Sequence, residues 1–163
     1  MINIYTKCVR FLVYGMVTLS GIGIVTMMVV VCAEVILRKI FNSPITGAYD
    51  IVKCSSAITI CGALPYTTAV KGHVAIEYFY LKLSKGKRLI VEAFIRLISI
   101  VLFGFFSWYS IQHGKSLRRS GEVLLTLEVP VFWIPWVIAF SCGIVILVLI
   151  HGLLQPGKEL MKL

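Results

Sequence analysis

Residues 129–154 read VPVFWIPWVIAFSCGIVILVLIHGLL, and residues 11–33 read FLVYGMVTLSGIGIVTMMVVVCA; neither stretch contains a formally charged residue. Each exceeds the roughly 20 residues that a helix needs to cross the hydrocarbon of a bilayer. Because backbone polar groups in hydrocarbon must be satisfied inside the segment, both stretches are expected to be helices. Two further apolar stretches accompany them. The sequence therefore predicts an all-α integral membrane protein with four transmembrane helices, at about residues 11–40, 48–70, 89–113 and 130–154.

The composition fits a single membrane domain that occupies residues 1–163. Hydrophobic residues make up 59% of the sequence and the mean hydropathy is +0.95, whereas soluble domains are nearer about 45–50% apolar. Four spans of about 22 residues leave only short tails and connections. The sequence contains no phosphate-binding loop and no nucleophile with an adjacent base. We therefore do not expect an enzyme.

A basic stretch that is too polar to cross a membrane lies between the second and third predicted spans. Ile76, Phe79, Tyr80 and Leu83 recur at i, i+3, i+4 and i+7, which places them on one face of a helix. We expect a short amphipathic helix in the membrane interface at about residues 74–86; an irregular basic loop is the alternative. The expected anchors at the membrane interfaces are Lys82, Lys85, Arg88, Trp133 and Trp136.

The net charge of +9 is distributed as membrane topology requires, with basic residues at the ends of the apolar stretches and no basic stripe for nucleic acid. Four spans place both termini on one side. The basic residues of that side are nine: Lys7, Arg10, Lys71, Lys82, Lys85, Lys87, Arg88, Lys158 and Lys162. Those of the other side are six: Arg38, Lys39, Lys53, Lys115, Arg118 and Arg119. The positive-inside rule therefore predicts cytoplasmic termini.

Charged residues in or near the spans occur at helical pair spacings. Charges at membrane depth are costly and usually functional, and a partner one turn away reduces the cost of desolvation. We expect these residues to pair within the bundle or to face a second membrane protein. The pairs are Glu34 with Arg38, Asp50 with Lys53, and Glu92 with Arg96.

Glu34 also supports a different hypothesis, in which the chain is a self-sufficient homo-oligomeric transporter and this carboxylate binds the coupling ion. Small multidrug transporters use an unpaired membrane carboxylate in that way. Glu34 instead lies near the end of a span and has Arg38 one turn on. A structural or subunit-docking role is therefore favoured over ion coupling.

The cysteines and histidines do not form a cofactor site in the sequence. The chain has five cysteines and three histidines, and no CxxC motif. Cys54 and Cys61 share a helix face but lie about 10 Å apart along its axis, which is too far for a disulfide. His113 belongs to the opposite side of the membrane from His73 and His151, so only the latter two could ligate a haem at matched depth. His73 sits in a Lys-Gly-His loop, and a haem is therefore disfavoured. We expect no cofactor and no metal.

The order and spacing of several short motifs give the chain a family resemblance. It resembles the small membrane subunit, of the DctQ type, of tripartite ATP-independent periplasmic (TRAP) transporters, over essentially its whole length. Asp50 stands where that family more often has Glu. The matching residues are Arg38, Phe41, Pro44-Ile45, Asp50, Gly62-Ala63, Gly72-His73-Val74, Ile76, Glu77, Leu127-Glu128-Val129-Pro130 and Pro135.

The resemblance implies a non-catalytic subunit of the bacterial inner membrane. Such a subunit braces a large multi-span membrane subunit that carries substrate and sodium, among membrane lipids. A periplasmic binding protein delivers the substrate, commonly an organic acid such as a C4-dicarboxylate or sialic acid. On this interpretation the residues facing the large subunit are Glu34, Arg38, Asp50, Lys53 and Arg96. The candidates for docking the binding protein, on the outer connections, are Arg118, Arg119, Glu122 and Glu128.

Overall fold

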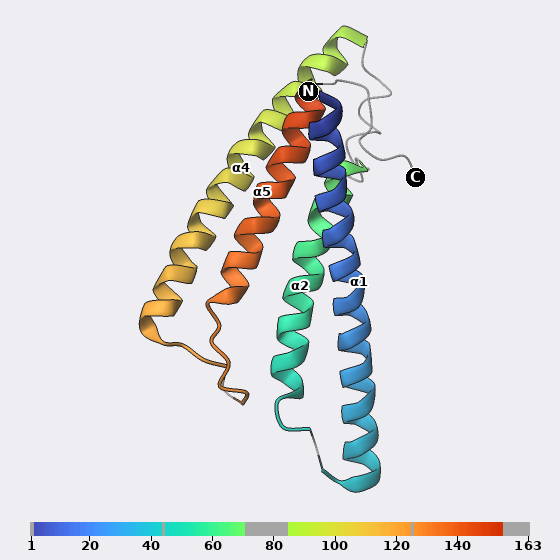
Figure 1. Ribbon diagram of the computed structural model, residues 1–163, viewed down its shortest axis with the longest axis vertical. Helices are drawn as coiled ribbons and strands as arrows, with labels where there is room; N and C mark the ends of the chain where they lie inside the picture. The colour runs from blue at the N-terminus through green and yellow to red at the C-terminus, as the bar shows by residue number, and fades with distance from the viewer. Residues whose placement is uncertain (1, 44, 71–84, 125, 155–163) are drawn as a thin grey trace.

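The computed structural model describes residues 2–43, 45–70, 85–124 and 126–154. Four helices follow one another in this part of the chain: α1 (Ile2–Phe41), α2 (Ala48–Ala69), α4 (Lys85–Ser120) and α5 (Trp133–Leu154) (Figure 1). The described residues form no β-strand, only an isolated antiparallel bridge between Val123 and Pro130. The predicted all-α fold class is confirmed.

Three of the described helices have the length and apolar composition of membrane spans: Tyr5–Phe41, Ala93–Ser120 and Trp133–Leu153. The helix outside this set is α2, whose 22 residues include many with small and hydroxyl side chains. At 1.5 Å per residue, α2 is about 33 Å long, slightly more than the roughly 30 Å thickness of the hydrocarbon. Its crossing of the membrane stays a prediction.

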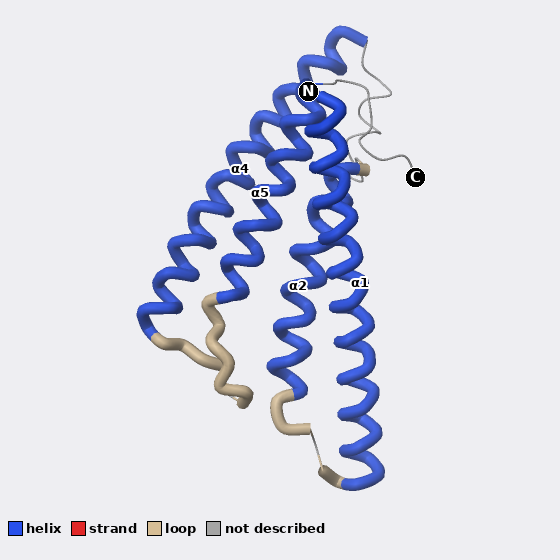
Figure 2. The backbone as a smooth tube through the Cα atoms, in the orientation of Figure 1, coloured by secondary structure: helices blue, strands red, loops and turns tan. Residues whose placement is uncertain are grey.

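The helices pack in the spatial order α1, α2, α5, α4. α1 lies against α2, α5 lies against both α2 and α4, and α1 makes a smaller contact with α5. α1 and α4 begin, and α5 ends, at the same end of the bundle, which we call the terminal end (Figure 1). The opposite end, which we call the loop end, carries the described residues of the α1–α2 and α4–α5 connections (Figure 2). In this view the α1–α2 and α4–α5 pairs lie farther apart at the loop end than at the terminal end.

Several helix ends differ from the sequence predictions. α1 begins at Ile2 rather than near residue 11, and α4 continues to Ser120 rather than ending near residue 113. The length of an apolar stretch indicates where the hydrocarbon of the membrane ends, but the helix itself can continue beyond it into water. Basic side chains in the last turn of α4 also suit the negative end of the helix dipole. As a result, Arg118 and Arg119 lie on a helix and not in the connection that we predicted.

α5 begins later than predicted, and most of the predicted interfacial helix lies outside the described residues. α5 begins at Trp133 rather than near Pro130, because Pro130 forms the bridge with Val123 and the backbone N–H of Val131 donates to the Glu122 carbonyl oxygen. Residues 74–84 of the predicted interfacial helix lie outside the described residues, and residues 85 and 86 belong to α4.

The packed core of the chain lies in the terminal half of the bundle. Its central side chains are at most 6% exposed and come from three helices. α1 supplies one side of the cluster, α5 supplies the other, and Ala69 closes it from the last turn of α2. The members are Val9, Val13, Met16, Ala69, Ile144 and Val148.

α1 and α2 cross closely because both carry small residues where they meet. A Cβ atom placed on Gly62 would lie 2.5 Å from the Met16 carbonyl oxygen, and one on Gly23 would lie 2.5 Å from Thr59 Oγ1. The Ser20 hydroxyl donates to the Thr59 carbonyl oxygen at 2.9 Å. Such small-residue contacts and interhelical hydrogen bonds are the usual means of helix association in membranes.

Candidate functional site

Asp50 joins the two helix pairs at the loop end. It lies in the first turn of α2 and is 4% exposed. Its Oδ2 atom accepts hydrogen bonds from the backbone N–H groups of Thr126, at 3.0 Å, and Leu127, at 3.2 Å. Hydrogen bonds to an ionised acceptor are roughly twice as strong as neutral ones. The carboxylate therefore fixes a connection that is 76 residues away in the sequence.

The predicted pairing of Asp50 with Lys53 is wrong. Lys53 is exposed, and the structure contains no ion pair between these two described residues. The spacing of three permits contact, but two backbone N–H groups satisfy the carboxylate from the connection instead. Pair spacing within one helix carries no information about a distant loop that competes for the same side chain.

The described residues of the connection between α4 and α5 have a defined shape of their own. Leu124 N–H donates to the Val129 carbonyl oxygen at 2.9 Å, and Glu128 N–H donates to the Leu124 carbonyl oxygen at 3.0 Å. Glu128 itself is in the left-handed region, with φ +53°. These bonds close a short hairpin-like turn, which we call the outer loop (residues 122–124 and 126–131).

Gly47, just before α2, lies in close contact with the outer loop. It precedes α2 with φ +89°, and a Cβ atom placed on it would lie 2.8 Å from Leu127 Cδ2. A residue with a side chain would meet both a strained backbone and a steric clash at this position. Sequence reasoning treated Gly47 only as a turn residue, because its contact with Leu127 comes from tertiary structure.

The four predicted docking charges are all near the loop end and exposed, but they come from two elements. Arg118 and Arg119 lie in the last turn of α4, and Glu122 and Glu128 lie in the outer loop. The Arg118 guanidinium stands 5.8 Å from the centre of the Phe132 ring, within cation–π range. The end of α4 is thereby attached to the segment that leads into α5.

The predicted pair of Glu34 and Arg38 is confirmed on α1. The Arg38 guanidinium donates to Glu34 Oε1, one turn apart. Glu34 is partly buried and Arg38 is exposed, with side-chain exposures of 23% and 66%. The exposed residues around the pair are mostly apolar, namely Val31, Val35, Ile36 and Ile40, with Lys39 as a charged exception. The pair therefore lies on an apolar outer face of the described chain.

Arg96 serves the terminal end of the bundle. Its Nη1 atom donates to the Gly152 carbonyl oxygen in the last turn of α5, where carbonyl groups lack partners within the helix. A guanidinium at a helix C-terminus also suits the helix dipole. Its predicted partner Glu92 lies in α4, but the side chain of Glu92 is outside the described part of the structure.

His151 belongs to a polar cluster that the sequence analysis did not identify. Thr6 Oγ1 lies 3.2 Å from His151 Nε2, and the Tyr5 ring stacks on the imidazole with centroids 6.2 Å apart. The Tyr5 hydroxyl donates to the Leu147 carbonyl oxygen at 2.8 Å. His151 is 4% exposed. The sequence indicated this cluster only weakly, because Tyr5 and Thr6 precede the first predicted span and His151 lies near the end of the fourth.

The structure describes the side chains of two of the predicted membrane anchors, Trp133 and Trp136. Trp133 is exposed at the start of α5 and packs edge-on against Trp136, with Phe132 completing an aromatic cluster. Lys82 lies outside the described residues. Lys85 and Arg88 lie in the first turns of α4, and nothing of their side chains is described.

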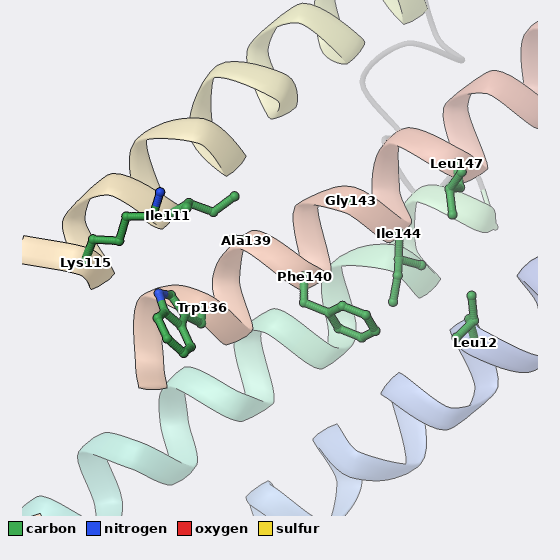
Figure 3. Close-up of a pocket in the computed structure, with 9 residues that line it drawn as sticks. All are labelled: Leu12, Ile111, Lys115, Trp136, Ala139, Phe140, Gly143, Ile144 and Leu147. Atoms are coloured by element: carbon green, nitrogen blue, oxygen red, sulfur yellow. The ribbon is translucent and has the colours of Figure 1, made fainter. Parts of the chain in front are cut away.

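An apolar groove runs along α5 between α4 and α1 (Figure 3). Its volume is about 600 Å³. Lys115 is the one charged residue of the lining, at the end where Trp136 lies. Such a lining suits hydrocarbon. The remaining lining residues are Leu12, Ile111, Trp136, Ala139, Phe140, Gly143, Ile144 and Leu147.

The described residues bring together no group of three or more His, Cys, Asp or Glu side chains able to hold a metal ion. All five cysteines are free. The two carboxylates that sequence reasoning singled out on α1 and α2 both have partners, Glu34 in Arg38 and Asp50 in the outer loop. The described chain thus presents exposed charges at the loop end of a bundle whose packed core lies at the terminal end.

Comparison with known proteins gives one family. Residues 27–157 match the family model described as tripartite ATP-independent periplasmic transporters, DctQ component. The match runs from the second half of α1 past the end of α5 and so includes all of α2, Asp50 and the outer loop. No curated protein and no solved structure matches the chain.

Proposed function

The chain belongs to the DctQ family of tripartite ATP-independent periplasmic transporters, and on this premise we propose how it serves transport. The family identifies a transporter component of the bacterial inner membrane, which works with a large membrane subunit and a periplasmic binding protein. We propose that this chain braces the large subunit and helps to dock the binding protein, in a sodium-coupled importer of organic acids. The match over residues 27–157 carries this proposal.

The placement of the carboxylates supports a role without an ion path of its own. Within the described residues, Glu34 is neutralised by Arg38 on the outer face of α1, and the Asp50 carboxylate binds the outer loop. A coupling carboxylate needs to exchange ions along a path through the protein. Neither of these residues lies free in the interior of the bundle, so coupling is assigned to the large subunit.

The test is uptake of radiolabelled organic acids into proteoliposomes under an imposed sodium gradient. The chain alone is expected to give no uptake, and the chain with its large subunit and binding protein is expected to give sodium-dependent uptake. Uptake by the lone chain that is lost in Glu34→Gln would replace this proposal with that of a self-sufficient small transporter.

We propose that α2 is the fourth span and that the loop end faces the periplasm. α1 and α4 both begin at the terminal end, so the chain returns from the loop end between them, and α2 is the helix that makes this passage (Figure 1). The excess of basic residues near the termini favours a cytoplasmic terminal end. In a cysteine-free background, Ser43→Cys is then labelled by a membrane-impermeant maleimide in cells with a permeable outer membrane. Labelling only after lysis would reverse the orientation.

We propose that the large subunit contacts the chain through the outer face of α1, through Lys53 on α2 and, at the other end of the bundle, through Arg96 on α4. The proposed contacts are Glu34, Arg38, Lys53 and Arg96. Asp50, which the sequence also suggested for this contact, is buried under the outer loop and is left out of it. Breaking a partly buried ion pair in an interface leaves one charge unpaired. Arg38→Ala is therefore expected to reduce co-purification of the large subunit, whereas Thr18→Ala, whose hydroxyl bonds only within α1, leaves it unchanged. Equal recovery with both variants would place the contact elsewhere.

A further inference from the structure

We infer that Asp50 is a positioning residue for docking: its carboxylate holds the outer loop at the spacing at which the loop-end charges meet the binding protein. The inference rests on the proposed docking function and adds a residue that lies beneath the docking surface. Asp50 acts through the backbone of Thr126 and Leu127 and is not itself available to a partner, because it is 4% exposed.

The geometry makes Asp50 the polar link between the outer loop and α2. Two N–H groups converge on one carboxylate oxygen, at 3.0 and 3.2 Å, which is a charge-assisted arrangement with two donors. The carboxylate also lies in the first turn of α2, where the helix dipole favours a negative charge. Both features favour this one position for the side chain.

Apolar packing supports the same arrangement from beside the carboxylate. Leu127 packs against Gly47 so closely that Gly47 has no room for a Cβ atom. Leu124, at the base of the loop, is 5% exposed. The bonds between Leu124 and Val129 and between Glu128 and Leu124 give the loop its internal shape. Asp50 therefore fixes the place of a loop that is already shaped, rather than the fold of the loop itself.

The exposed charges depend on this placement in different ways. Glu122 and Glu128 lie within the outer loop and move with it. Arg118 and Arg119 lie on α4 and keep their positions by the helix and by the contact of Arg118 with Phe132. Release of the loop from Asp50 would leave the arginines in place and let the two glutamates move. A surface that must be ordered on binding has a lower affinity than one ordered in advance.

The test uses the complete three-component transporter in proteoliposomes, with initial uptake measured against the concentration of binding protein. Asp50→Ala is expected to raise the half-saturating concentration by about tenfold, equivalent to about 1.4 kcal/mol, at an unchanged maximal rate. Asp50→Asn keeps one acceptor oxygen and is expected to give a smaller rise. Ser56→Ala is the matched control on α2, because the Ser56 hydroxyl bonds only to the Lys53 carbonyl oxygen of its own helix.

A second measurement reports the loop directly. Hydrogen–deuterium exchange of the purified complex is expected to be faster in Asp50→Ala for peptides that contain Thr126 and Leu127, whose N–H groups lose their acceptor. Peptides from the first three turns of α1 are expected to exchange as in the unaltered protein. Unchanged exchange in the outer loop would overturn the inference.

The uptake results separate the inference from the function on which it rests. A fall in maximal rate with an unchanged half-saturating concentration would make Asp50 a residue of assembly and would overturn the inference. An effect of Arg118→Gln with Arg119→Gln, but none of Asp50→Ala, would support docking at the loop end and refute the role of Asp50. No effect of any of these variants on the half-saturating concentration would refute the docking function itself.

Discussion

The two ends of the bundle are held together in different ways. At the terminal end, α1, α2 and α5 share a core whose central side chains are at most 6% exposed, and Arg96 attaches α4 to the last turn of α5. At the loop end, the connection between α4 and α5 reaches α2 through the Asp50 carboxylate and the packing of Leu127 on Gly47. We infer from this difference that packing at the terminal end stabilises the chain, whereas the loop end presents the charged surface proposed for docking.

The largest expected effect on the terminal half comes from Gly62→Leu. Even a Cβ atom at Gly62 would lie 2.5 Å from the Met16 carbonyl oxygen, so α1 and α2 must separate to admit a leucine side chain. We expect the free energy of unfolding, measured by denaturant titration in detergent, to fall by about 3 kcal/mol.

Gly21→Leu is the matched control, because nothing lies within 4 Å of a Cβ atom at Gly21. Its free energy of unfolding is expected to stay within about 0.5 kcal/mol of the unaltered protein. A similar loss in both variants would show that close crossing of α1 and α2 does not hold the terminal half.

An intermediate effect is expected at the loop end from Gly47→Ala. The backbone of Gly47 has φ +89°, and the new methyl group would displace Leu127. We expect a loss of about 1 kcal/mol in the free energy of unfolding, with faster hydrogen exchange in the outer loop.

The control for this change is Gly15→Ala, a helical glycine with open space around it, where alanine is expected to be neutral or stabilising by up to about 1 kcal/mol. Faster exchange at the terminal end in Gly47→Ala would contradict the separation of the two ends.

The smallest expected effect is that of Tyr5→Phe, which removes the hydroxyl that donates to the Leu147 carbonyl oxygen. Hydrogen bonds between membrane helices contribute about 0.6 kcal/mol on average, and we expect a loss of that order in the same titration. Tyr14→Phe, on the exposed face of α1, is expected to change nothing measurable. Equal losses in the two variants would remove Tyr5 from the contacts that hold the terminal end.

The apolar stretches predicted the helices because length and the absence of charge are local properties of the sequence. They did not predict the end of α4, since the residues from Lys115 to Ser120 continue the helix with mostly polar side chains that a hydropathy rule excludes. The pair of Glu34 and Arg38 was predictable for the same local reason, because both residues lie on one helix a single turn apart.

The contacts that join the helices were not predictable from one sequence. Asp50 meets Thr126 across 76 residues, and Arg96 meets Gly152 across 56. In each case the acceptor or donor on the other side is a backbone group, which every residue has and which no sequence pattern marks. The sequence could therefore identify Asp50 and Arg96 as unusual, but it could not identify their partners.

The most direct test of the division between the two ends compares one variant from each in the reconstituted transporter, with uptake measured against the concentration of binding protein. The account predicts that Arg118→Gln with Arg119→Gln raises the half-saturating concentration at an unchanged maximal rate. It predicts that Arg96→Leu, which leaves the Gly152 carbonyl group without this donor, lowers the amount of assembled transporter and thus the maximal rate. Changes in the same kinetic parameter for both variants would contradict the account.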